Sequence, residues 1–360
     1  MKIVQVIPSF EIAGAEIMCE NLIYELKSLG HEVIVLSMYS YKSAITERLE
    51  NAGISIKYLD KKPGLDLSMF KKIKQVLRDE KPDVVHTHLY VTKYVFPIAS
   101  SMGIKVIHTI HTVASKDSNY ILRKLDKQYF KSKKVLPVAL SGLIRDSVVA
   151  EYGIQEEDVP IIFNGINLSR CRIKNEYNYK EKFVILHIGR FSELKNHQGL
   201  LEAFNIFHKK FPDSELWLIG DGEEKEKALK YVENQNLQER VKFLGLQDNV
   251  YGFLNSADIF TLPSHYEGIP MTLIEAMGTG LPIVATRVGG IPDMLDDSSA
   301  ILVSTDVREI AQAFERYYMS EDLRKAHGTK ALVASEKFSA NEMAVNYLKV
   351  YNKAVNNNGK

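Results

Sequence analysis

Two cations follow an apolar run near the middle of the chain with a spacing that suits a diphosphate. The run Phe183–Ile188 is followed by Gly189 and Arg190, and Lys195 comes five positions after Arg190. A guanidinium can bind phosphate oxygens through two parallel hydrogen bonds, and an ammonium adds a compact charge. The helix predicted to follow would add free backbone N–H groups and the positive end of its dipole. The segment therefore predicts a phosphate-binding site.

Two glutamates eight positions apart form a second candidate segment. Glu267 follows the apolar run Asp258–Leu262, and Glu275 lies about two turns into a helix predicted to start at Pro270. Gly268 leaves the backbone between them open, so that loop amides could donate hydrogen bonds to a ligand. A carboxylate on a helix that packs against a sheet needs a polar partner. The segment predicts a site for a polar ligand.

Four histidines raise the question of a metal site. His86 and His88 form a His-x-His pair, and His108 and His111 form a His-x-x-His pair, which are spacings that can chelate a cation. Acidic or cysteine ligands do not accompany them at regular spacing, and the chain lacks an Asp-x-Asp element. We therefore predict structural or site-lining roles for these histidines and no bound metal. The two cations described above could neutralise a diphosphate in place of a divalent ion.

Strand and helix patterns alternate along almost the whole chain. Short apolar runs separated by helical patterns are typical of parallel sheets covered by helices on both faces. The pattern predicts an α/β protein with two Rossmann-like, doubly wound domains facing across a cleft. The expected strands are Ile3–Ile7, Val33–Ser37, Ser55–Tyr58, Val84–Thr87, Lys105–Thr109, Val135–Leu140, Pro160–Phe163, Phe183–Ile188, Glu215–Ile219, Val241–Phe243, Asp258–Leu262, Pro282–Ala285 and Ala300–Val303, and the clearest helices are Ala15–Leu29, Ser68–Arg78, Leu143–Tyr152 and Ala340–Val355.

A polar, tyrosine-rich stretch interrupts this alternation and marks the expected domain boundary. It has no apolar period, and the strand pattern restarts at Phe183. We expect an N-terminal domain over residues 1–168, a linker over 169–182 and a C-terminal domain over 183–339.

Composition argues for an ordinary globular protein without a nucleic-acid partner. The 360 residues include 46 Lys+Arg and 45 Asp+Glu, so the chain lacks the surplus of positive charge that binding to phosphate backbones requires. Two cysteines, Cys19 and Cys171, are too few for a disulfide framework. Since neither a signal-peptide pattern nor a membrane-spanning apolar run is present, we expect a cytoplasmic protein.

Basic residues gather in Lys116–Lys134, where aromatic and aliphatic residues are interleaved with them. An amphipathic helix of this kind can touch anionic lipid or a lipid-linked substrate, which would place the protein peripherally on the inner face of a membrane. An ordinary surface helix with a solvated lysine face would show the same pattern. Both interpretations remain open at this point.

Six motifs stand in order along the chain: Ala13–Glu16, His108–His111, Asn164–Asn167, Gly189–Arg190 with Lys195–Asn196, Gly220–Gly222, and Glu267 through Glu275. Taken together, they resemble those of glycosyltransferase family four, a group of retaining enzymes that use nucleotide sugars and have the GT-B fold. The last motif matches the Glu-x7-Glu element of that family. Two departures are Ala13, where glycine is common, and Asp293, where glutamate is usual.

The resemblance implies roles for residues of the second half, which would bind the nucleotide sugar. Arg190 and Lys195 would neutralise the donor diphosphate, and Glu275 would bind the ribose hydroxyls. Glu267 would hold the donor sugar and act in catalysis. The backbone of Gly268, Ile269 and Pro270 would hold the donor sugar together with Glu267. The nucleobase would lie near Leu246.

The resemblance also implies roles for the first half, which would bind the acceptor. His111 would lie near the sugar and the reaction centre as a second catalytic residue. Gly14 and Asn164 would contribute to donor binding, Gly14 by letting its backbone approach the diphosphate. The last helix, about 340–356, would pack back on this domain.

The activity that follows is transfer of a hexose or N-acetylhexosamine from a nucleoside diphosphate sugar, with UDP the expected carrier, to a hydroxyl of a saccharide or lipid-linked acceptor. Surface polysaccharide or capsule synthesis is the expected setting. No cofactor is expected, because the nucleotide sugar is the substrate. Fixed cations and amides would stabilise the departing diphosphate. Since no convincing nucleophile is present, we favour front-face attack by the acceptor over a covalent intermediate.

Three other functions are alternatives to this one. A nucleotide-sugar epimerase would use the same two-domain cleft without an acceptor, and a non-enzymatic nucleotide-sugar-binding protein would bind without transfer. A nicotinamide-dependent oxidoreductase would need Gly-x-Gly-x-x-Gly after the first strand, where the sequence reads Pro8–Gly14 without that pattern.

Overall fold

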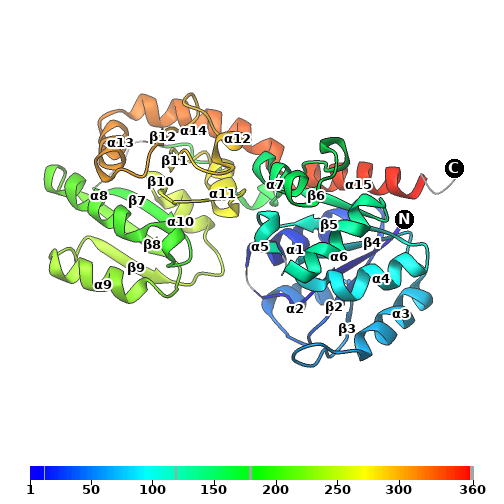
Figure 1. Cartoon of the computed structure of the whole chain (residues 1–360). Helices are drawn as coiled ribbons and strands as arrows, with labels where there is room; N and C mark the ends of the chain where they lie inside the picture. The colour runs from blue at the N-terminus through cyan, green and yellow to red at the C-terminus, as the bar shows by residue number, and fades with distance from the viewer. Residues whose placement is uncertain (12, 118–119, 178–180, 357–360) are drawn as a thin grey trace. The chain divides into compact units, whose positions relative to one another are not determined.

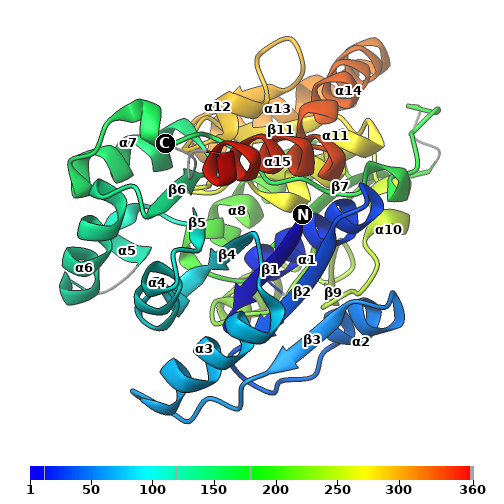
Figure 2. The same cartoon turned by 90° about the vertical axis from the view of Figure 1, so that its right-hand side faces the viewer.

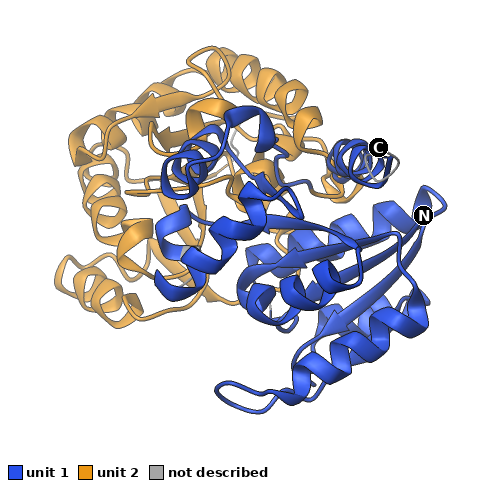
Figure 3. Ribbon diagram, turned by 45° about the vertical axis from the view of Figure 1, so that its right-hand side comes forward, with its two compact units in different colours: residues 1–165, 340–360 blue, residues 166–339 orange. Residues whose placement is uncertain are grey.

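The computed structural model describes residues 1–11, 13–117, 120–177 and 181–356. The chain divides into two compact units, drawn in blue and orange in Figure 3. The first consists of residues 1–165 and the C-terminal segment from Ala340, and the second of residues 166–339. In the described part of the chain, no helix combines the length and apolar character needed to cross a membrane.

The first unit is built on a six-stranded parallel sheet with the order β3-β2-β1-β4-β5-β6 (Figure 1). Its strands are β1 (Lys2–Ile7), β2 (Glu32–Ser37), β3 (Ser55–Tyr58), β4 (Val84–His88), β5 (Lys105–Ile110) and β6 (Val135–Ala139). Its helices are α1 (Gly14–Ser28), α2 (Ala44–Asn51), α3 (Ser68–Glu80), α4 (Thr92–Ser101), α5 (Ala114–Asp117), α6 (Tyr120–Lys131), α7 (Gly142–Tyr152) and α15 (Ala340–Asn356).

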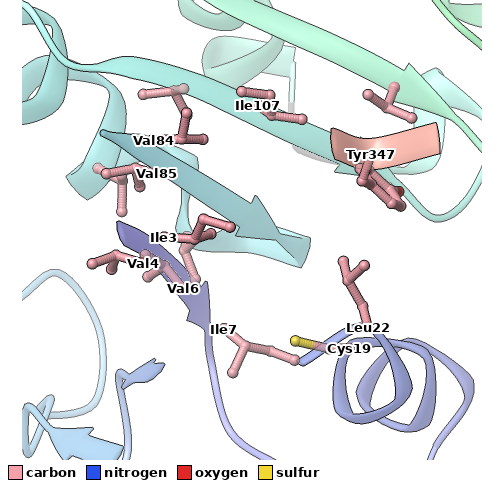
Figure 4. Packing of buried hydrophobic residues seen from close by; sticks show 14 of the residues in the cluster. Ile3, Val4, Val6, Ile7, Cys19, Leu22, Val84, Val85, Ile107 and Tyr347 are labelled. Carbon is pink, nitrogen blue, oxygen red and sulfur yellow. The ribbon is translucent and has the colours of Figure 1, made fainter. Parts of the chain in front are cut away.

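Apolar side chains of the central strands form the core of this unit. Ile3 and Val6 of β1 and Val85 of β4 are fully buried, and Leu22 of α1 and Tyr347 of α15 belong to the same cluster (Figure 4). Helix α15 packs against α1 and β5 (Figure 2). The last helix of the chain is therefore part of the first sheet's cover.

The second unit repeats this plan with a parallel sheet of order β12-β11-β10-β7-β8-β9. Its strands are β7 (Phe183–Ile188), β8 (Ser214–Ile219), β9 (Val241–Gly245), β10 (Ile259–Leu262), β11 (Ile283–Thr286) and β12 (Ile301–Val303). Its helices are α8 (His197–Lys210), α9 (Lys225–Asn234), α10 (Tyr251–Ser256), α11 (Met271–Thr279), α12 (Ile291–Met294), α13 (Val307–Met319) and α14 (Glu321–Ser335). The prediction of two doubly wound α/β sheets is confirmed.

One expected strand was wrong. Instead of forming a strand at Pro160–Phe163, the segment gives Ile161 an isolated bridge to Ala139 at the end of β6. Ile162 N–H donates to the Ala139 carbonyl at 2.9 Å. The apolar run has the composition of a strand. It lies at the edge of the sheet, where it pairs with β6 at one point.

The stretch expected to join the domains is packed on the second unit over the residues described. Cys171 and Tyr177 are buried, and the Tyr177 hydroxyl donates to the Gly280 carbonyl at 2.9 Å. Lys174 Nζ donates to the Ala257 carbonyl at 2.8 Å. Residues 178–180 of this stretch lie outside the described part.

The basic stretch 116–134 forms the end of α5 and the whole of α6, with residues 118 and 119 outside the described part. Helix α6 buries Phe130 against the core of the first unit. It leaves Tyr120, Ile121 and Leu125 exposed, with Ile121 retaining 72% of its accessible surface. The helix is amphipathic, and part of its apolar surface faces solvent.

Candidate functional site

The loops that carry the predicted donor residues leave neighbouring strands of the second sheet. Strand β10 pairs with β7 on one side and with β11 on the other, and all three run parallel. The segments that follow their carboxyl ends therefore emerge side by side, although the loops after β7 and β10 are about 70 residues apart in sequence.

An ion pair joins the first two loops. Lys195 Nζ lies 2.6 Å from Glu267 Oε1, and the Ser264 hydroxyl donates to the same oxygen at 2.6 Å. The Lys195 side chain is 21% exposed and that of Glu267 is 8% exposed, so the pair is largely withdrawn from water. Among the described residues, none hydrogen-bonds to Glu267 Oε2.

Backbone hydrogen bonds fix the loops against each other beside this pair. His265 N–H donates to the Leu194 carbonyl at 2.8 Å, and Asn196 Nδ2 donates to the Pro263 carbonyl at 3.0 Å. Asn196 has a left-handed backbone (φ 54°) and caps α8 by accepting from Gly199 N–H at 3.1 Å. One asparagine thus begins the helix and anchors the neighbouring loop, which keeps Lys195 in place.

The loop after β11 supports the backbone at Glu267 from the other side. Gly290 N–H donates to the Glu267 carbonyl at 3.1 Å. Gly289 has φ 54°, and a Cβ there would lie 1.8 Å from the Glu267 carbonyl oxygen. A Cβ at Gly290 would lie 2.3 Å from the Gly268 carbonyl oxygen. These two glycines were not predicted as site residues, although consecutive glycines after a strand were the available signal.

Arg190 is not brought to this ion pair. Its side chain is 74% exposed, and its Nη2 lies 3.0 Å from Glu223 Oε2 in the loop after β8. The loop after β8 passes close to the loop after β7, since a Cβ at Gly220 would lie 2.0 Å from the Gly189 carbonyl oxygen. The guanidinium is therefore a surface cation at the same edge of the sheet, held by an exposed partner that a phosphate could replace.

Glu275 lies in a separate, half-buried environment on α11. Burial raises the pKa of its carboxyl to about 7, against the opposing effects of Arg170 and of the Tyr251 hydroxyl. That hydroxyl lies 3.5 Å from Glu275 Oε1, and Arg170 stands 5.0 Å from the Tyr251 ring centre. Arg170 and Tyr251 were missed from sequence: one falls in the stretch taken as a linker, and the other belongs to no motif.

The remaining predicted residues of this unit lie along the same loops. Pro270 precedes α11, which begins at Met271, one residue later than expected. Ile269 is buried, while Gly268 has no atom within 4 Å of the position where a Cβ would be built. Leu246 follows β9 and keeps 78% of its surface, so it is an exposed apolar side chain.

Three predicted residues belong to the first unit. His111 follows β5, and its Nε2 lies 3.3 Å from Nδ1 of His88. Asn164 is buried near the end of the first unit's main segment. Gly14 begins α1, with nothing within 4 Å of the position of an added Cβ. Over the described residues, no three His, Cys, Asp or Glu side chains form a group that could hold a metal ion.

Two family models match nearly the whole chain between them. "Glycosyltransferase Family 4" matches residues 12–170 and "Glycosyl transferases group 1" matches residues 170–332. A two-unit α/β fold with a cation and a carboxylate at the carboxyl edge of the second sheet fits a glycosyltransferase of the GT-B fold class. The chain belongs to glycosyltransferase family 4.

Individual relatives agree with this assignment. The chain is 26% identical to N-acetyl-alpha-D-glucosaminyl L-malate synthase of Bacillus anthracis, over 94% of each chain. It is 28% identical to the UDP-Gal:alpha-D-GlcNAc-diphosphoundecaprenol alpha-1,3-galactosyltransferase of Escherichia coli, over 62% of this chain and 63% of that one. The crystal structure of Anabaena HepE in complex with UDP-glucose has the same fold, with a TM-score of 0.83 and 18% identity over 98% of this chain and 100% of that one.

The close approach of the loop after β11 gives a stability prediction. Gly289→Ala should lower the free energy of unfolding by at least about 2 kcal/mol, because the methyl group meets the Glu267 carbonyl and the left-handed backbone is strained. Gly268→Ala is the matched control and should change it by less than about 1 kcal/mol, since an added Cβ there meets nothing. Urea unfolding of both variants measures this, and equal losses would contradict the support assigned to Gly289.

The raised pKa of Glu275 makes the stability of the folded protein depend on pH. Its pKa is about 7 in the folded protein against an ordinary 4.5, so the folded state binds more protons between these pH values. Stability that is fully present below about pH 4.5 is therefore lost as the pH rises through 7. Between pH 5 and pH 8 the wild type should lose about 2–3 kcal/mol relative to Glu275→Gln. Urea unfolding across this range tests it, and parallel pH profiles would contradict the raised pKa.

Proposed function

We propose that the protein transfers a hexose or N-acetylhexosamine from a nucleoside diphosphate sugar, most naturally a UDP-sugar, to a hydroxyl of a saccharide or lipid-linked acceptor. The observation that carries the proposal is the Lys195–Glu267 pair, a cation and a carboxylate held 2.6 Å apart at the carboxyl edge of the second sheet. A UDP-glucose complex of the similarly folded HepE supports a UDP-sugar as the donor.

The proposed chemistry uses the cation for the leaving group and the carboxylate for the sugar. Lys195 has three donors, so its ammonium can keep Glu267 and still reach a phosphate oxygen. Arg190 is exposed and can exchange Glu223 for the diphosphate. Together they would stabilise the negative charge that grows on the departing nucleoside diphosphate, without a metal ion. Glu267 would accept a hydrogen bond from a sugar hydroxyl on Oε2.

Glu275 and the first unit complete the proposed assignment. Glu275, with Tyr251 and Arg170 beside it, would bind the ribose hydroxyls, and Leu246 would lie by the base. His111 would act on the transferred sugar, with Gly14 and Asn164 assisting donor binding. We propose retention of configuration through front-face attack by the acceptor hydroxyl. Relatives that act on diphosphoundecaprenol-linked sugars support a lipid-linked acceptor in surface polysaccharide or capsule synthesis.

Donor hydrolysis and transfer test this function. Purified protein in EDTA, given a panel of nucleoside diphosphate sugars, should release the nucleoside diphosphate from one of them slowly without acceptor and faster with a suitable acceptor. Lys195→Ala and Arg190→Ala should each lower this rate on the order of 100-fold, because each removes a cation that would donate hydrogen bonds to the leaving group. Lys227→Ala is the control, since Lys227 is exposed and pairs with Glu224.

Either of two results would contradict the proposal. Turnover that requires a divalent ion would overturn the metal-independent mechanism. Binding of a nucleotide sugar with neither hydrolysis nor transfer, across the whole panel, would indicate a binding protein instead.

We also propose that α6 brings the protein to an anionic membrane surface, where lipid-linked acceptors are found. Exposed Ile121 and Leu125 beside the basic residues of the helix support this. The protein should sediment with vesicles containing anionic lipid but not with zwitterionic vesicles. Ile121→Asp should weaken this several-fold, whereas Ile173→Asp, at another exposed apolar site in the second unit, should not. Equal binding by both variants would contradict the role of α6.

A further inference from the structure

A chain of buried polar side chains crosses the first unit from α15 to His111. Gln5 of β1, His86 and His88 of β4 and Thr109 of β5 share the sheet face that α15 covers, because alternate residues of a strand point to the same side. All four are fully buried. Polar groups at such depth need hydrogen-bond partners, so their mutual contacts determine where each proton lies.

The arm that reaches His111 begins at the Gln5 amide. Gln5 Oε1 lies 2.9 Å from His88 Nε2, and His88 Nδ1 lies 3.3 Å from His111 Nε2. Gln5 Oε1 can only accept, so His88 must carry its proton on Nε2. A neutral His88 then has a lone pair on Nδ1, which must accept from His111 Nε2–H. The amide thus determines the protonation pattern of both rings.

The other arm matches this orientation of the amide. Gln5 Nε2 donates to the Tyr351 hydroxyl at 3.4 Å, and this hydroxyl lies 2.7 Å from His86 Nδ1. Since the hydroxyl accepts from Gln5, its own proton can go to His86 Nδ1. His86 Nε2–H then donates to Thr109 Oγ1 at 2.8 Å. Every member of the chain has a donor facing an acceptor.

Both central histidines are held neutral, as this pattern requires. Burial lowers the pKa of His86 and of His88 well below the ordinary value, and the neighbouring histidines His108 and His111 lower both further. The rings of His86 and His88 lie with centroids 4.2 Å apart, so a charge on one would oppose a charge on the other. Neither ring can supply a second proton to His111 near neutral pH.

We propose that Gln5 and His88 are positioning residues that fix the tautomer of His111, with the proton on Nε2 and the lone pair on Nδ1. His111 then acts on the substrate as a hydrogen-bond acceptor for a hydroxyl, through Nδ1. The catalytic part of this inference rests on the proposed function. The tautomer assignment depends only on hydrogen bonds within the first unit.

The tautomer can be read directly in the full-length protein. Nitrogen-15 NMR of histidine-labelled protein near pH 8, with the His111 and His88 signals assigned from His111→Asn and His88→Asn, reports which ring nitrogen carries each proton. We expect both rings to be protonated on Nε2. Protonation of His111 on Nδ1 with a bare Nε2 would overturn the proposal, because it requires the Gln5 amide and the whole chain in the reverse orientation.

Variants of Gln5 test the consequence. Gln5→Leu removes the acceptor for His88, so the His111 tautomer should become mixed and kcat should fall on the order of tenfold with donor KM unchanged. Thr87→Val is the matched control. Thr87 lies on β4 between His86 and His88 but faces the opposite side of the sheet, where its buried hydroxyl is bonded to His108, so both readouts should stay at wild-type values. Equal losses in the two variants would overturn the positioning role.

Gln5→Glu keeps the shape of the side chain, so it provides a second test if Gln5→Leu does not fold. A carboxylate there should protonate His88, whose Nδ1–H then donates to His111 Nε2 and moves the His111 proton to Nδ1. An unchanged His111 tautomer in this variant would contradict control by Gln5. If no donor is turned over by the wild type, the proposed function fails while the NMR result still decides the tautomer.

Discussion

The second unit depends on one largely buried ion pair, Lys195 with Glu267. Removing either partner would leave the other charge withdrawn from water, which costs about 3 kcal/mol or more for a buried pair. The Ser264 hydroxyl also stabilises the Glu267 carboxylate, because it donates to the oxygen that Lys195 contacts. The surrounding backbone hydrogen bonds, from His265 to Leu194 and from Asn196 to Pro263, ensure that the pair forms in one geometry. The pair is therefore preorganised, as the proposed stabilisation of a departing diphosphate would require.

Sheet topology makes this pair possible. β7 and β10 are neighbours in the sheet while their loops are far apart in sequence, and β11 lies on the other side of β10. Glycines then let three loops approach more closely than side chains would allow, most tightly at Gly289 against the Glu267 carbonyl. The chemistry is thus distributed over three strand ends, and the glycine spacing is a packing requirement of the site.

The sequence predicted the strands well, because fully buried parallel strands are apolar throughout. It also indicated that Lys195 and Glu267 follow two of these strands, and the structure pairs them. It predicted Pro160–Phe163 wrongly because an extended apolar segment at a sheet edge has the same composition as a strand. It gave no sign of the Ser264 contact, which depends on a loop turning back on itself. Arg170 and Tyr251 meet Glu275 through packing between distant segments, and such meetings leave no pattern in sequence. The hydrogen-bonded chain from Gln5 to His111 likewise needs the strand register and α15 before it can be recognised.

A crystal structure with UDP, grown in EDTA, tests the central claim most directly. The account predicts the diphosphate within hydrogen-bond distance of Lys195 Nζ and Arg190, with Arg190 released from Glu223 and the ribose hydroxyls at Glu275. UDP bound elsewhere, with Lys195 and Arg190 still engaged only by their carboxylate partners, would contradict the assignment of this edge of the sheet as the donor site.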